Sequence, residues 1–76
     1  MRPVRTERDK IAAKARRMTR DPVIAAVWRE AWNRVLDRLA PHHSNEFARE
    51  AMLRALVAGK SIAAAETISF DSANKR

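Results

Sequence analysis

The chain has 76 residues, no cysteine and a net charge of +7. Disulfides are therefore excluded, the two histidines are too few for a structural zinc site, and no stretch approaches the roughly 20 apolar residues that cross a bilayer. A single glycine among many alanine, leucine, arginine and glutamate residues favours one small helical domain. So short a chain buries little surface by itself, and we expect a partner chain to stabilise it.

Positive charge is concentrated at the N-terminus, where eight cations and two carboxylates give the first twenty residues a net charge of +6. Residues 1–6 lack apolar periodicity and are expected to form a flexible basic arm. This arm also lacks the apolar stretch of a secretory signal, so we expect a cytoplasmic protein. Clustered cations attract polyanions, which include nucleic acids and acidic protein surfaces.

The first helix is predicted over residues 7–20, because Thr6 and Asp9 have the spacing of a capping box. Ile11, Ala15 and Met18 form one narrow apolar stripe, and cations surround it. Several cations on one helix can contact consecutive phosphates, although a solvated face would have the same composition. The predicted nucleic-acid-binding residues are Arg5, Arg8, Lys10, Lys14, Arg16, Arg17 and Arg20.

The second helix is predicted over residues 22–40, with Asp21 as N-cap and Pro22 at the first helical position. Its apolar residues cover more than half of the circumference, a width that fits a helix packed on two sides. On its polar side, Glu30 and Arg34 are spaced as an i,i+4 ion pair. Trp28 and Trp32 have the spacing of stacking platforms for bases, but packing in a core or subunit interface is the preferred interpretation.

The third helix is predicted over residues 45–58, after a stop at Pro41 and a cap at Ser44 or Asn45. Gly59 suits the left-handed position that follows a helix. This helix also has two apolar faces, so helices two and three together offer more apolar surface than a three-helix monomer covers. We therefore predict a homodimer whose contact includes Trp28, Trp32, Leu36, Leu53 and Val57.

A short fourth helix over residues 62–66, capped by Ser61, is possible, with Ile68 and Phe70 beyond it as isolated anchors. The predicted fold is all-α, a small bundle of three principal helices with a possible short fourth. The predicted organisation is an arm at residues 1–6, one helical domain at 7–70 and a frayed polar tail at 71–76.

The segment from Arg54 to Ile68 fits a helix-turn-helix pattern, with Gly59 in the turn. Against this motif, Ala65 stands where a larger apolar residue would join the two helices. The preferred interpretation is a helix C-cap followed by a terminal helix.

The sequence has no pattern typical of a cofactor, metal or catalytic site. His42 and His43 are adjacent in a turn, with no nearby ligands to complete a metal shell. No serine or threonine stands in a nucleophile arrangement with a histidine and a carboxylate. Gly59, Lys60 and Ser61 resemble the end of a phosphate-binding loop but lack its upstream glycine. We expect no cofactor, no metal, no membrane contact and no enzymatic activity.

Two functional hypotheses follow from these observations. In the first, the protein is a small nucleic-acid-binding accessory or regulatory protein that contacts phosphates through its arm and first helix. In the alternative, it is an inhibitor or adaptor, of the kind that mobile elements and phages encode, that binds an acidic protein partner through its apolar faces and basic helix. The scarcity of side chains that read bases favours the alternative.

Overall fold

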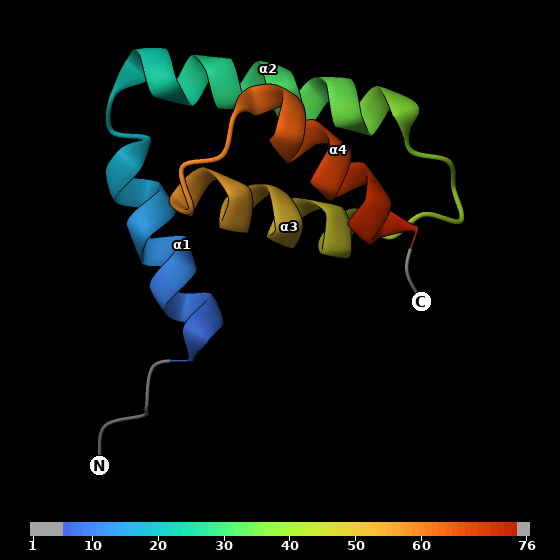
Figure 1. Cartoon of the computed structure of the whole chain (residues 1–76), viewed down its shortest axis with the longest axis horizontal. Helices are drawn as coiled ribbons and strands as arrows, with labels where there is room; N and C mark the ends of the chain where they lie inside the picture. Colours follow the sequence, from blue (N-terminus) through green and yellow to red (C-terminus); the bar gives the residue numbers. More distant parts are fainter. Residues whose placement is uncertain (1–5, 75–76) are drawn as a thin grey trace.

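Helices account for all the regular structure of residues 6–74, the part of the chain that the computed structural model describes (Figure 1). They are α1 (Glu7–Met18), α2 (Pro22–Arg38), α3 (Asn45–Val57) and α4 (Ile62–Ala73). The prediction of an all-helical domain is confirmed. Most of the predicted basic arm, including Arg5, lies outside the described residues.

Each helix begins at the cap that local sequence predicts. Thr6 and Asp9 form the full capping box of α1, in which the Asp9 N–H donates to the Thr6 hydroxyl at 3.2 Å. The Asp21 carboxylate accepts from the Val23 N–H at 2.8 Å at the start of α2. Serine hydroxyls cap α3 and α4, and the two residues are Ser44 and Ser61.

Gly59 ends α3 in the left-handed conformation, with φ of 75°. Its N–H donates to the Leu56 carbonyl at 3.1 Å, and the Lys60 N–H donates to the Ala55 carbonyl at 3.0 Å. This pair of bonds is a Schellman motif, which satisfies carbonyls that would otherwise lack partners at the helix end. The tight turn that results returns the chain to pack α4 against α3.

The fourth helix is longer than the sequence predicts, since it runs over Ile62–Ala73 instead of residues 62–66. Ile68 and Phe70 therefore lie within a helix, and its last turn includes residues 71–73, which were assigned to the polar tail. Ala73 is buried, and its carbonyl accepts a hydrogen bond from the Ser44 N–H at 3.0 Å. Residues 6–74 thus form four helices of comparable length.

Small side chains let α3 and α4 approach closely. Ala48 and Ala55 of α3 and Ala65 of α4 are buried in one cluster, which also includes Val35 of α2. The hydroxyl of Ser69 is fully buried beside them and donates to the Ala48 carbonyl at 2.6 Å. Burial of this serine is therefore matched by a hydrogen bond, as an apolar environment requires.

Arg34 makes a different ion pair from the one predicted. Its guanidinium contacts Glu66 of α4 at 3.0 Å, so it joins α2 to α4 instead of pairing with Glu30 within α2. Hydrogen bonding to Glu66 raises the pKa of Arg34. The predicted i,i+4 pair is wrong because a carboxylate from another helix lies within reach.

The first helix stands apart from the other three. It packs on α3, and Figure 1 shows it turning away from α2 at the corner formed by residues 19–21. The described Cα atoms extend over 41 × 32 × 17 Å, so the molecule is about two helix layers thick. Because a flat molecule encloses little volume, Val35 is the largest side chain that is fully buried among the described residues.

Candidate nucleic-acid interface and an adjoining groove

Three cations share the face of α1 that points away from α3. Lys10, Lys14 and Arg17 are all exposed and lie roughly 100–160° around the helix from Ala15, which is buried. We call these three residues the outer face of α1. Exposed Arg16 and Arg20 flank it on the other side of the helix.

Within the described part of the chain, most cations of α1 and of the turn that follows it form no ion pair with a carboxylate. Within residues 6–74 the ion pairs are Arg8–Glu46 at 3.1 Å, Arg34–Glu66 at 3.0 Å and Arg54–Glu50 at 3.2 Å. In this part of the chain no ion pair therefore involves the outer face of α1 or its flanking arginines. Their charge is available to an external polyanion. Arg8 differs from the other predicted residues because it pairs with α3.

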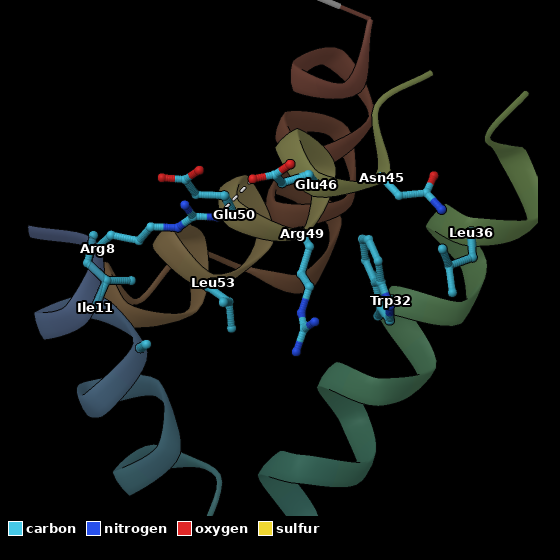
Figure 2. Close-up of a pocket in the computed structure, with 10 residues that line it drawn as sticks. Arg8, Ile11, Trp32, Leu36, Asn45, Glu46, Arg49, Glu50 and Leu53 are labelled. Atoms are coloured by element: carbon cyan, nitrogen blue, oxygen red, sulfur yellow. Dashed lines mark hydrogen bonds and ion pairs between the residues drawn. The ribbon is translucent and has the colours of Figure 1, made fainter. Parts of the chain in front are cut away.

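A groove opens between α1 and α2, with α3 as its floor (Figure 2). Its volume is about 580 Å³. Each of the three helices contributes apolar side chains, and prominent lining residues are Ile11, Trp32, Leu36 and Leu53. Two smaller hollows of about 240 and 260 Å³ share Arg49 and Leu53 with this groove, so the three spaces adjoin.

Arg49 lies at the centre of the groove and was not predicted as a site residue. Figure 2 shows its side chain pointing from α3 into the space between α1 and α2. It is exposed and takes no part in the ion pairs of residues 6–74, whereas the neighbouring carboxylates of Glu46 and Glu50 do. Its sequence position carried a signal, since it lies one turn before Leu53 on the second apolar face of α3.

The residues predicted for a dimer contact are largely brought together by the fold. Trp32, Leu36 and Leu53 line the groove, and Trp28 lines an adjoining hollow. Both tryptophans also pack against the core, which agrees with the preferred interpretation of their spacing. Val57 is half-buried and lies outside these lining sets. Assembly through these residues stays a prediction.

In the helix-turn-helix alignment of residues 54–68, α4 would be the recognition helix, but its chemistry is unsuitable for binding DNA. The helix contains no lysine or arginine, and it carries Glu66 and Asp71. Negative charge is unfavourable next to phosphates. Ala65, the position that argued against the motif, is fully buried in the close α3–α4 packing.

The two histidines belong to the turn between α2 and α3. The Ala40 N–H donates to Nδ1 of His43 at 2.7 Å, and the His43 ring lies 5.1 Å from that of Phe70. His43 thus stabilises the turn and packs on α4. Among residues 6–74, no three histidine, cysteine, aspartate or glutamate side chains are grouped to hold a metal ion.

None of the described helices has both the length and the apolar composition that crossing a bilayer would require. Comparison with known protein families, with curated proteins and with solved structures found no match for this chain.

Proposed function

We propose that this protein binds nucleic acid through the phosphate backbone, using the outer face of α1. One observation carries the proposal: Lys10, Lys14 and Arg17 are exposed on one face and take no part in the ion pairs of the described residues. Arg16 and Arg20 widen the same positive surface. Unneutralised cations arranged in this way bind phosphates by releasing condensed counterions.

The spacing of the outer face suits a polyphosphate backbone. Lys10 and Arg17 are about 10 Å apart along the helix axis, a length over which duplex DNA carries roughly six charges. The absence of cations from α4 leaves the helix that follows the α3–α4 turn unsuited to entering a groove and reading bases. We therefore propose binding that depends little on base sequence, as befits an accessory or regulatory protein.

Binding assays over a range of salt concentrations test this proposal, with duplex DNA, single-stranded DNA and RNA measured in parallel. On duplex DNA, each contacted phosphate contributes about −0.9 to the slope of log affinity against log salt. Three to five contacts predict a slope of about −2.7 to −4.5 that is shared by unrelated duplex sequences. Failure of all three nucleic acids to bind at physiological salt would refute the proposal and favour the protein-binding hypothesis.

A further inference from the structure

We propose that the groove between α1 and α2 binds an acidic amphipathic helix of a partner protein. The helix would place its apolar face on Trp32 and Leu53 and a carboxylate on Arg49. This surface is separate from the outer face of α1, which points away from α3. The inference therefore goes beyond phosphate binding and does not depend on it.

The shape of the groove fits a helical occupant. Two diverging helices form its walls and a third forms its floor, as around an open position in a helical bundle (Figures 1 and 2). Along α2, the lining residues of the groove and its adjoining hollow run from Ala25 to Leu36, about 17 Å at 1.5 Å per residue. Roughly three turns of a partner helix match this length, with apolar anchors at positions i, i+3 or i+4, and i+7.

The apolar lining provides a surface for such anchors. Leu36 is 36% exposed although it is a large hydrophobic residue, and Ile11, Trp32 and Leu53 are only half-buried. Figure 2 shows Leu53 directed from α3 into the same space as Arg49. A flat helical domain leaves this apolar surface exposed to water. A partner helix that covered it would gain binding free energy from its burial.

Charge favours an acidic partner. The carboxylates that line the groove, Glu46 and Glu50, are already paired with Arg8 and Arg54. The cations around the groove and its adjoining hollows are not all neutralised, since the ion pairs within residues 6–74 do not include Arg16, Arg29 and Arg49. A carboxylate at Arg49 would form a charge-assisted hydrogen bond, in a bidentate arrangement where geometry allows.

The same charges argue against the other occupants. A symmetric pair of copies, the assembly predicted from the sequence, would use the same groove and would place the cations of one copy against those of the other. Nucleic acid suits the groove less well than it suits the outer face of α1, because Ile11, Leu36 and Leu53 of the lining offer phosphates no partner.

Labelled synthetic peptides test the proposal with the full chain by fluorescence anisotropy. The probes are tryptophan-free 18-residue helices of glutamate and alanine, with leucine or phenylalanine anchors at i, i+3, i+7 and i+10. Matched peptides carry lysine in place of every glutamate. The variant is Arg49→Glu, and its control is Lys60→Glu, which makes the same charge change at an exposed position beyond α3. Arg49→Gln provides a second variant of similar length without charge reversal.

We expect an acidic peptide to bind, the lysine peptides not to bind, and the tryptophan emission of the protein to change on binding. Arg49→Glu should weaken binding by about tenfold or more, Arg49→Gln by less, and Lys60→Glu by less than about twofold. Circular dichroism checks that each variant is folded. Absence of binding by every acidic peptide, or equal losses in Arg49→Glu and Lys60→Glu, would overturn the proposal.

Two other results would also overturn it by assigning the groove to another occupant. Dimers in sedimentation that Leu53→Asp dissolves would assign the groove to a second copy of the chain. Loss of DNA binding in Arg49→Glu that equals the loss in Lys14→Glu would assign it to nucleic acid. Failure of the peptide experiment with intact DNA binding leaves the role of the outer face of α1 unaffected, so the two proposals fail separately.

Discussion

Replacing Lys10, Lys14 and Arg17 together with alanine is expected to reduce the steepness of the salt dependence of duplex binding by about 2.7 units. Each of these exposed side chains is proposed to neutralise one phosphate, and each lost contact returns about 0.9 units. The helix itself should persist, because alanine has the highest helix propensity. Fluorescence anisotropy with a labelled duplex between about 50 and 200 mM salt measures the change.

A charge-matched control separates the position of the cations from the total charge. Replacing Arg29, Arg49 and Lys60 with alanine removes the same three charges from exposed positions outside α1. We expect this variant to keep most of the parental slope. If both triple variants lost the same steepness, the general positive charge of the protein would explain binding and the outer face of α1 would have no special role.

Replacing Ala65 with leucine is expected to reduce the free energy of unfolding by about 1–3 kcal/mol, the usual cost of overpacking a core. Ala65 has no exposed surface and lies in the cluster where α3 and α4 approach closely. Loss of this size is large for 76 residues, since about 0.05–0.15 kcal/mol per residue gives a total stability of roughly 4–11 kcal/mol. Urea unfolding followed by circular dichroism measures it.

The neighbouring position Ala63 supplies the control for this substitution. It lies on the same helix but is exposed, so Ala63→Leu adds the same side chain where space is available. We expect its unfolding midpoint to change little. Equal midpoints for the two leucine variants would show that α3 and α4 do not pack as closely as described.

The helix starts and the end of α3 were predictable because their causes are local. Thr6, Asp21 and Ser44 cap their helices through hydrogen bonds to backbone groups two or three residues away. Gly59 ends α3 through bonds that span four to six residues of chain. Such short-range chemistry is readable in the sequence whatever the tertiary structure.

The full length of α4 was missed because its buried face is made of small residues. Ile62, Ala65, Ser69 and Ala73 recur at helical spacing and face the core. Hydrophobic periodicity detects large apolar side chains, and a serine in the pattern reads as polar. Burial of Ser69 becomes favourable only when the Ala48 carbonyl of α3 is available to accept its hydrogen bond, and that is a tertiary contact.

The same distinction between local and tertiary causes applies to the two candidate sites. Exposure of Lys10, Lys14 and Arg17 follows from one apolar stripe on α1, which sequence shows directly. The groove depends on the angle between α1 and α2, so Arg49 could be placed at its centre only from the fold. The Arg34–Glu66 pair, which joins residues 32 positions apart, was beyond sequence reasoning for the same reason.

Contact between nucleic acid and the outer face of α1 can be located directly by a two-dimensional NMR titration of the isotope-labelled protein with a short DNA duplex. We expect the largest changes in amide chemical shift at Lys10, Lys14 and Arg17 and near Arg16 and Arg20, and we expect these changes to fade as salt is raised. Little change is expected along α4, which has no cations. Shifts concentrated on α4, or no shifts at low salt, would show that the outer face of α1 does not bind nucleic acid.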